Sequence, residues 1–556
     1  MALTKVSYSM IDGPYVNVTD YGVVGDGSTD DSDALQACFT DATSKGLSVI
    51  FSSSDNVKIT KTLTQDCPVI GNGATINIYI ANAATYPYAF NCSADITDLN
   101  FTGVNSVAGV GAIKMYASNK IISFCSFASI LGNAFRSPSG FSGNTITQCN
   151  LNICGRYSDF SSMYIHTKTK VIDNTITNSP SKGIEVGESG TENQIIGNVV
   201  TDVATVPTAQ EAIYSGWYTS KITIQNNTIR RVSSGAAAIK ISRQSTDCSV
   251  IGNAIEGTQG IFSQGGVNNS IVGNRTPNIS VNSHSDGFTI LPDTGCNIIG
   301  NAVFGVIDLG GVGSGDVNET YVVGNNCTII SGLYSSHYGT YIASNVCTGI
   351  NFLIDNSVST ASIRPLTIKN NTVTRFASGT GIVARGVDLF DPFEADTIVI
   401  EGNYVRGPGA STGGTIGIES LGVEKLSISN NVVESVETGF LVNRVKTLKF
   451  ENNVSVTDVG TGYSFSDSDS ATYWPGSGND YIINNNLGTY VSVASSRVFF
   501  YLAEKDKYAS AAPTTGYHLV GEYRINTVPT AGGFWGFVCV TAGTPGTWKT
   551  FGAISA

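Results

Sequence analysis

One short motif recurs along most of this chain and limits the folds that it can adopt. The motif is an apolar residue, two variable residues and an asparagine, followed within two positions by another apolar residue, as in IIGNVV around Asn198. It returns at intervals of 20 to 32 residues. Such a period is typical of architectures in which each repeat buries its apolar side chains only against its neighbours. The asparagines of the motif are Asn144, Asn174, Asn198, Asn227, Asn253, Asn274, Asn301, Asn325, Asn345, Asn371, Asn403, Asn431 and Asn453.

A second short apolar segment lies near the middle of most intervals, such as GIEV at 183–186. Its alternation predicts a strand that buries Ile184 and Val186 and turns Glu185 outward. Two or three short strands per repeat, with Asn or Gly at a corner, predict an all-β fold: a parallel β-helix of about 13 coils. Asparagine suits the corner because it tolerates left-handed backbone and its amide can hydrogen-bond the next coil.

Both ends of an open β-helix expose a sheet edge, so each end needs a cover. Residues 30–45 place apolar side chains at helical spacing, which predicts a capping helix. Asp30 or Asp31 suits its N-cap, and Gly46 suits its end. The apolar positions of this helix are Ala34, Leu35, Cys38, Phe39 and Ala42.

Four segments follow from the repeat and its two ends. They are an N-terminal segment with the capping helix (1–60), the parallel β-helix (61–490), a linker or trimer contact (491–512) and a small C-terminal β domain (513–556).

Charge and hydropathy exclude two classes of partner. The formal net charge is −12 and the chain has no Lys/Arg stripe, so we expect no nucleic-acid binding. The longest apolar runs fall far short of the ~18 residues needed to span a bilayer, so we expect no membrane insertion. Only 13% of the residues are charged, which makes clustered charges conspicuous.

The cysteines and histidines give no pattern of a metal site. The eleven Cys are scattered singly, and the four His include no pair at i,i+4 spacing. The N-terminus has no apolar segment of the kind found in secretory signals, so we expect free buried thiols. No phosphate loop or dinucleotide fingerprint is present. We predict neither a metal nor a cofactor.

Two end segments carry a family resemblance. The segment from Val16 to Gln36, VNVTDYGVVGDGSTDDSDALQ, resembles the opening of the pectate-lyase-like β-helix superfamily. The preceding MALTKVSYSMI resembles the start of many bacteriophage tailspikes. Residues 513–554, with their GG-W-G-FVC-T-AGTPGTW-FG pattern, resemble the small C-terminal β module of such spikes.

This resemblance implies that the parallel β-helix is right-handed. It also implies a phage tailspike that binds and depolymerises a bacterial capsular or O-antigen polysaccharide. Such spikes are homotrimers in the virion tail, made in the host cytoplasm and acting at the bacterial surface. The chain lacks the large N-terminal particle-binding domain of the longest spikes, so attachment to the tail or baseplate directly, or through an adaptor protein, is expected.

A glycosidase needs two carboxylates, about 5–5.5 Å apart for retention and about 6.5–9.5 Å apart for inversion. Outward positions on neighbouring coils are separated by about 4.8 Å, which suits either case. Glu185 and Glu188 lie on and just beyond one strand, and Glu211 precedes the matching strand of the next coil. We predict that these three glutamates are the catalytic residues.

Substrate-binding side chains are predicted beside them. Trp217 and Tyr218 offer flat faces for sugar stacking, and Lys240 and Arg243 can hold a uronate or another acidic sugar. An alternative interpretation remains open, in which Glu185 and Lys240 form a solvated charge ladder with Lys182.

A second patch contains Asp293, Tyr341 and five residues that we predict to bind substrate: His284, Asp286, Asp308, His337 and Tyr338. The order Ser285-Asp286-Gly287, Asp308, His337-Tyr338-Gly339 and Arg364 resembles that of the four motifs of plant-type polygalacturonases, although none of these motifs is intact here. A His or Tyr base here would suit a lyase, which removes the proton next to a uronate carboxyl. Asp286 before Gly287 is equally explained as a turn residue.

The sequence therefore favours a tailspike that hydrolyses glycosidic bonds. Three alternatives remain open: a polysaccharide lyase acting by β-elimination, a non-catalytic receptor-binding adhesin that uses the same groove, and a plant-cell-wall pectinase, against which the broken motifs count.

Overall fold

The computed structural model forms two compact units, 1–306 and 307–556. It describes residues 15–81, 87–104, 109–155, 160–203, 211–232, 237–257, 260–282, 284–285, 290–291, 293–310, 317–335, 337, 339–354, 365–374, 379–386, 397–409, 414–456, 461–466, 480–484, 486–487, 490–494, 498–501, 508–515, 518 and 520–556.

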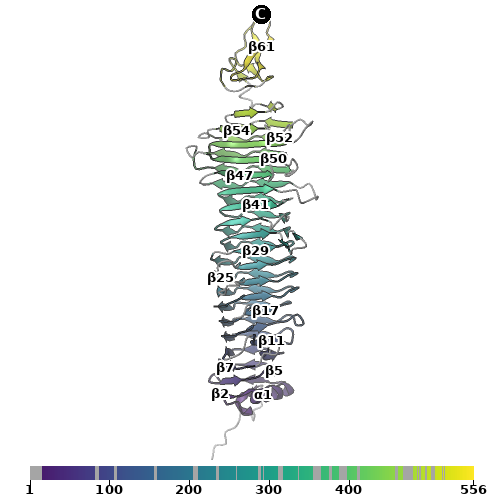
Figure 1. The fold of residues 1–556 in the computed structure, drawn as a ribbon, viewed down its shortest axis with the longest axis vertical. Coiled ribbons are helices and arrows are strands. Elements are labelled where there is room, and N and C mark those ends of the chain that lie inside the picture. Colours follow the sequence, from purple (N-terminus) through teal and green to yellow (C-terminus); the bar gives the residue numbers. More distant parts are fainter. Residues whose placement is uncertain are drawn as a thin grey trace, which may run out of the picture. The chain divides into compact units, whose positions relative to one another are not determined.

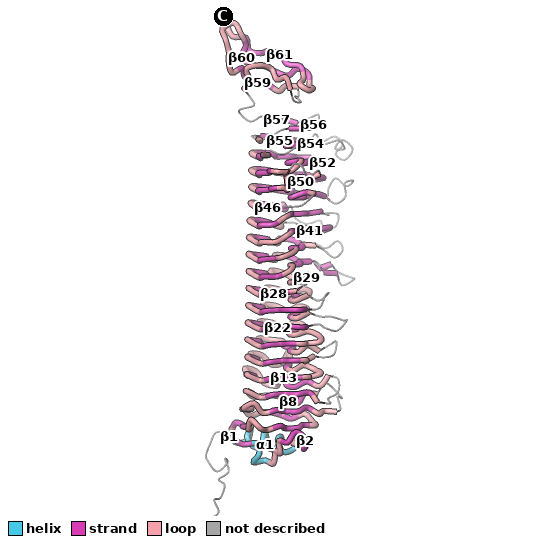
Figure 2. The backbone as a smooth tube through the Cα atoms, turned by 90° about the vertical axis from the view of Figure 1, so that its left-hand side faces the viewer, coloured by secondary structure: helices cyan, strands magenta, loops and turns pink. Residues whose placement is uncertain are grey.

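In the first unit nearly every turn contributes three short strands, and each strand pairs in parallel with its counterpart on the next turn (Figures 1 and 2). We call these stacks the first, second and third series. The first series is β5 (Leu63–Gln65), β8 (Tyr88–Cys92), β11 (Gly111–Met115), β14 (Phe135–Arg136), β17 (Met163–Ile165), β20 (Ile184–Val186), β23 (Ile213–Ser215), β26 (Ile239–Ile241), β29 (Ile261–Gln264) and β32 (Ile279–Asn282).

The second and third series complete each turn. The second is β1 (Tyr15–Asn17), β3 (Ser48–Ile50), β6 (Val69–Ile70), β9 (Ile96–Thr97), β12 (Ile121–Ser123), β15 (Thr145–Thr147), β18 (Lys170–Ile172), β21 (Gln194–Ile196), β24 (Thr223–Gln225), β27 (Ser249–Ile251), β30 (Ser270–Val272) and β36 (Asn297–Ile299). The third is β2 (Asp26–Asp30), β4 (Asn56–Ile59), β7 (Thr75–Ile78), β10 (Asn100–Gly103), β13 (Ser126–Ala128), β16 (Asn150–Asn152), β19 (Thr175–Thr177), β22 (Val199–Val203), β25 (Thr228–Val232), β28 (Ala254–Glu256), β31 (Arg275–Thr276) and β37 (Ala302–Val303).

The second unit repeats this parallel pairing. Two strands of a turn merge in the long β50 (Ile416–Ser429) and β52 (Thr438–Glu451), which pair along most of their length. The others that join them are β41 (Ile329–Ser335), β44 (Gly349–Ile354), β47 (Thr380–Gly386), β54 (Thr461–Ser466), β56 (Tyr490–Ala494), β40 (Tyr321–Val323), β42 (Tyr341–Ala343), β45 (Leu366–Lys369), β48 (Thr397–Glu401), β55 (Asp480–Asn484) and β57 (Val498–Tyr501), with β43 (Val346–Cys347), β46 (Thr372–Thr374), β49 (Tyr404–Arg406), β51 (Val432–Glu434) and β53 (Val454–Ser455) as a separate sheet.

Across the two units, the described strands make about 14 turns of a parallel β-solenoid, which confirms the predicted fold. Parallel pairing begins at β1 and still holds at β57, so it reaches beyond both ends of the expected range 61–490. A separate sheet of β58 (Tyr508–Ala509), β59 (Tyr523–Asn526), β60 (Phe534–Thr541) and β61 (Thr547–Ala553) forms the expected C-terminal β module.

The repeated asparagines form buried hydrogen-bond ladders. In the first unit the ladder runs through Asn174, Asn198, Asn227, Asn253, Asn274 and Asn301, and the backbone N–H of each donates to Oδ1 of the next at 2.8–3.0 Å. In the second unit it runs from Asn325 to Asn453 and ends on Asn486, which lies beyond the last asparagine of the repeat pattern. The side chains therefore join successive turns, as predicted.

Two details of the ladder differ from the sequence-based prediction. Asn144 belongs to another corner, because it precedes the second-series strand β15 and accepts from the Lys120 N–H. From Asn174 to Asn453, the left-handed residue is also the one before each ladder asparagine, as at Asp173 (φ 55°) and Asn226 (φ 54°). The asparagine itself is selected by the hydrogen bonds of its side chain rather than by backbone strain.

The capping helix is present as α1 (Ser32–Lys45), and Gly46 ends it with a φ of 66°. Asp31 occupies the N-cap position, but its carboxylate accepts from the Val24 and Gly25 N–H groups instead of capping the helix. Phe39 is fully buried and meets Phe90 of β8 edge-on, with ring centroids 5.5 Å apart. The helix lies against β5 and covers the end of the stacked core (Figure 1).

Inward side chains of each series stack into apolar columns. Met163, Ile184, Ile213 and Ile239 occupy one column and are all fully buried. Ile184 and Val186 are buried and Glu185 between them faces outward, as the alternation predicted. The eleven cysteines are all free and buried, which confirms the expected thiols.

Candidate functional site

The outward side chains of the first series form a continuous polar column. Strand pairing brings each into register with its neighbour on the next turn. We call this set the outer column: Lys114, Arg136, Tyr164, Glu185, Tyr214 and Lys240. Because neighbouring strands lie about 4.8 Å apart, an extended polymer laid along the column would meet these side chains in sequence.

Glu185 is held by a lysine from its own turn. The Lys182 Nζ lies 2.7 Å from Glu185 Oε1, and only 14% of each side chain is exposed. The same ammonium lies 4.5 Å from the ring centroid of Tyr214, a cation–π contact with the next turn. Glu185 is thus fixed between Tyr164 and Tyr214, its two register partners.

Glu211 is held in a similar way on the following turn. Its Oε1 lies 3.3 Å from the Nζ of Lys240, and its side chain is 14% exposed. The charge-ladder alternative is correct that Lys182 pairs with Glu185. Lys240, however, pairs with Glu211 and not with Glu185.

A second row lies three residues beyond the outer column. Backbone hydrogen bonds from Ser189 to Trp217 and from Tyr218 to Arg243 bring Glu188, Trp217 and Arg243 to matching positions on three turns. The Arg243 guanidinium lies 3.9 Å from the centroid of the Trp217 ring. Among the described residues Glu188 is in no ion pair, and its side chain is exposed. Tyr218, at the left-handed corner, is 56% exposed.

The structure adds residues that the sequence interpretation missed. Tyr164 and His166 are the outward residues of the turn before Glu185, and both are half-buried. A Cβ on Gly187 would lie 2.1 Å from the Tyr164 hydroxyl and 3.3 Å from His166 Cδ2, so both rings meet over this glycine. Aligning SMYIH with GIEVG in the repeat would have found both positions.

Electrostatics distinguish these two rings. Burial raises the pKa of Tyr164, the Arg136 guanidinium 4.5 Å from its ring lowers it, and the charges of Glu185 and Glu188 raise it further. Burial lowers the pKa of His166, against the opposing effect of the Glu188 backbone. The phenol is therefore kept protonated and the imidazole neutral. His166 Nδ1 also lies 2.8 Å from the Thr167 hydroxyl.

The second predicted patch is placed differently. His284 lies in β33 (His284–Ser285) of the first unit, where only the backbone is described, while Asp286 and Tyr338 lie outside the described residues. Asp308 and His337 belong to the second unit. Burial raises the pKa of Asp308, and a hydrogen bond from the Ser331 hydroxyl opposes this shift.

His337 is a core residue. It is 2% exposed and meets Phe352 edge-on, with centroids 4.9 Å apart. Burial lowers its pKa to about 4, so the ring is neutral. A side chain in this position does not face a polymer on the surface, and we do not carry His337 into the proposed site.

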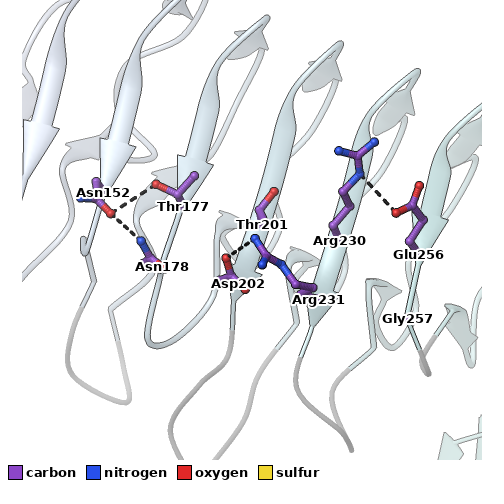
Figure 3. Close-up of a pocket in the computed structure, with 9 residues that line it drawn as sticks. All are labelled: Asn152, Thr177, Asn178, Thr201, Asp202, Arg230, Arg231, Glu256 and Gly257. Carbon is purple, nitrogen blue, oxygen red and sulfur yellow. Dashed lines mark hydrogen bonds and ion pairs between the residues drawn. The ribbon is translucent and has the colours of Figure 1, made fainter.

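A polar groove of about 910 Å³ lies along the third series (Figure 3). Its charges are paired internally: Arg230 Nε lies 3.3 Å from Glu256 Oε2, and Arg231 lies 2.7 Å from Asp202. Asn178 donates to Asn152 Oδ1 at 2.9 Å. No aromatic ring is among the described residues that line this groove, in contrast to the outer column.

Within the described ranges, no three His, Cys, Asp or Glu side chains gather closely enough to hold a metal ion. The same part of the chain contains no helix of the length and apolarity needed to cross a bilayer.

No protein-family model and no curated protein sequence matches the chain. Among solved structures, it is similar to the Dettilon tailspike protein, at 15% identity over 61% of this chain and 69% of that one, with a TM-score of 0.37. It is also similar to a DFA-IIIase mutant from Arthrobacter chlorophenolicus (11%, covering 66% and 95%, TM-score 0.36) and to PfbA, a surface adhesin of Streptococcus pneumoniae (14%, covering 78% and 92%, TM-score 0.27).

Proposed function

We propose that this chain is a phage tailspike that binds a bacterial capsular or O-antigen polysaccharide along the outer column and cleaves it by glycosidic hydrolysis. The observation that carries the proposal is the cluster of Glu185, Glu188 and Glu211 around the rings of Tyr214 and Trp217 on two adjacent turns. The two end segments of the chain support the tailspike assignment through the resemblance described above. Like such spikes, it would act as a homotrimer in the virion tail, attached directly to the tail or baseplate or through an adaptor protein.

The three glutamates would have different roles. Glu188 has no lysine partner among the described residues, so it can exchange a proton with the glycosidic oxygen or with water. Glu185 and Glu211 are each paired with a lysine, and their anionic form is the one that stabilises positive charge developing on the sugar. Trp217 and the exposed Tyr218 supply faces on which sugar rings can stack.

The experiment is incubation of the protein with a panel of purified capsular and O-antigen polysaccharides, followed by chromatography of polymer size and an assay of reducing ends. We expect one polysaccharide to be shortened. Glu188→Gln should lower the cleavage rate by a factor of about 10² or more if it transfers a proton. Glu256→Gln is the matched control, because it neutralises an exposed, ion-paired carboxylate on the third series.

Full activity in each of the variants Glu185→Gln, Glu188→Gln and Glu211→Gln would contradict the proposed site. Binding without any shortening of the polymer would contradict the enzyme and favour the adhesin alternative.

A lyase is the second candidate function, and Tyr164 with His166 is the observation that favours it. A protonated phenol, a neutral imidazole and the Arg136 guanidinium can serve as acid, base and carboxylate-neutralising group for β-elimination. Elimination leaves an unsaturated uronate that absorbs in the ultraviolet, whereas hydrolysis produces no such absorbance. The spectrum of the products separates the two reactions.

A further inference from the structure

Two cations face each other at the start of the outer column. Lys114 on β11 and Arg136 on β14 are direct register partners on the same face of adjacent strands, and both are half-buried. Like charges placed directly opposite each other across two strands destabilise a sheet. Neither side chain is in an ion pair among the described residues. The repulsion is therefore not relieved by a carboxylate of the described chain.

Aromatic rings support both cations. The Lys114 Nζ lies 4.9 Å from the ring centroid of Tyr116, and the Arg136 guanidinium lies 4.5 Å from that of Tyr164. Tyr116 is 40% exposed and also meets Phe141, with centroids 5.8 Å apart. Two fixed positive charges thus border exposed aromatic surface that can carry a sugar ring.

Elsewhere on the same unit, two exposed arginines have acidic partners. Arg230 and Arg231 of the groove are neutralised by Glu256 and Asp202. In a chain with a net charge of −12, an unneutralised pair of cations raises the local potential where an acidic polymer would otherwise be repelled. A guanidinium beside an ammonium suits a carboxylate, which it can bind with two parallel hydrogen bonds.

We propose that Lys114 and Arg136 form a subsite for a carboxylate-bearing sugar, two to three turns before Glu185, so that the polysaccharide is acidic. The inference rests on the proposed function, because it assigns this subsite to the glycan that the outer column binds. It also resolves how an acidic protein can hold an acidic polymer: the attraction is local and lies at one end of the column.

The test begins with an array of acidic and neutral bacterial surface polysaccharides, alginate and dextran included. Any polysaccharide that binds is then compared with its carboxyl-reduced form. We expect the bound polysaccharide to be acidic and carboxyl reduction to weaken binding about tenfold or more, with an affinity that falls as salt is added. A carboxyl-reduced polymer that still carries sulfate or phosphate and binds equally well would overturn the carboxylate subsite.

Variants locate the subsite. Lys114→Gln and Arg136→Gln should each weaken binding of the acidic polysaccharide about tenfold, and Lys114→Arg should restore most of it. Arg275→Gln is the matched control, because Arg275 also lies over a ring, Phe304, at 4.7 Å, but on the third series. If Lys114 had a purely structural role, replacing it would lower the Tm of the protein. Here we expect Lys114→Gln to keep or raise the Tm, because it removes a like-charge repulsion.

The outcomes separate the two proposals. Binding of a neutral polysaccharide, or unchanged affinity in both glutamine variants, overturns the acidic subsite and leaves the depolymerase standing. A lower Tm in Lys114→Gln with unchanged affinity also overturns it. Failure to bind any polysaccharide on the array overturns the proposed function, and the subsite with it.

Discussion

The backbone N–H and the side-chain Nδ2 of Asn198 both donate to a single oxygen, Oδ1 of Asn227, at 2.9 Å and 3.0 Å. Asn198 Nδ2 also donates to the Val171 carbonyl, at 2.9 Å. Both asparagines are buried, so these polar groups have no access to water. One amide thereby joins three successive turns, and the polar corner becomes a continuous part of the core.

Replacing one ladder residue should therefore be costly. Asn227→Ala leaves two donors of Asn198 buried without an acceptor, and we expect it to lower the free energy of unfolding by about 2–5 kcal/mol. Urea unfolding followed by circular dichroism measures the change. Asn152→Ala, at an exposed site of the third series, is the control and should change the free energy by less than about 1 kcal/mol. If both variants lowered the free energy of unfolding equally, the buried ladder would stabilise the fold no more than an exposed asparagine does.

Asp293 should make stability depend on pH. It is fully buried, accepts from the Ser263 hydroxyl and the Gly266 N–H through Oδ2, and has no partner for Oδ1 among the described residues. Burial raises its pKa to about 7. The folded state holds a proton that the unfolded state releases above about pH 4, so this group stabilises at low pH and its contribution is lost as the pH rises to 7.

The measurement is the free energy of unfolding between pH 4 and pH 8, in the wild type and in Asp293→Asn. As the pH rises across this range, the free energy of unfolding of the wild type should fall by up to about 4 kcal/mol relative to that of Asp293→Asn. A difference that stays constant with pH would show that Asp293 does not titrate in this window.

His337 should have the opposite effect. Burial lowers its pKa to about 4, so between about pH 4 and 6.5 the unfolded state binds a proton that the folded state does not. Its contribution to stability is full above pH 6.5 and is lost as the pH falls toward 4. His337→Phe should remove this loss, and thermal unfolding at pH 4.5 and pH 7.5 compares it with the wild type. A variant with the same pH dependence as the wild type would contradict the assignment.

Gly187 should matter for function more than for stability. A Cβ at this position would meet the Tyr164 hydroxyl, the far end of a side chain that can turn away. We expect Gly187→Ala to change the free energy of unfolding by less than about 1 kcal/mol and to reduce glycan cleavage by displacing Tyr164 and His166. Size chromatography of the polymer and urea unfolding provide the two measurements.

Gly216→Ala is the matched comparison on the next turn. Its Cβ would lie 2.8 Å from the Val186 carbonyl, which is backbone and cannot move aside. This variant should lose stability as well as activity. If Gly187→Ala destabilises the protein as much as Gly216→Ala, the glycine is structural and Tyr164 is not part of the site.

Much of the fold could be predicted from local pattern. The capping helix was expected over residues 30–45 and lies at Ser32–Lys45, because the spacing of Leu35, Cys38 and Phe39 suits only one face of a helix. Which residue takes the left-handed corner conformation could not be predicted, since Asn and Gly often stand side by side in the motif. In the structure Asn227 makes the ladder hydrogen bonds without a positive φ, and the preceding Asn226 takes the left-handed conformation.

The site could be predicted only in part. Outward-facing Glu185 followed from alternation, and Glu211, Trp217 and Lys240 followed from their positions on neighbouring repeats. Tyr164 was missed, although it occupies the outer column one turn before Glu185. His166 was missed as well, and it lies two residues beyond Tyr164. His337 looked like a site residue, because a sequence cannot show that the ring packs inside against Phe352.

By itself, the sequence determined the repeat, the parallel solenoid, the cap and the direction in which each strand residue points, because these depend on local periodicity and on the need to bury apolar side chains. Only the tertiary structure decided which outward residues meet. Loops of varying length separate the strands, so the register that places Lys114 opposite Arg136, and the pairing of Lys240 with Glu211, arise from hydrogen bonds and charges across turns. Those contacts determine whether clustered charges form a neutral ladder or leave a charge that a ligand can bind.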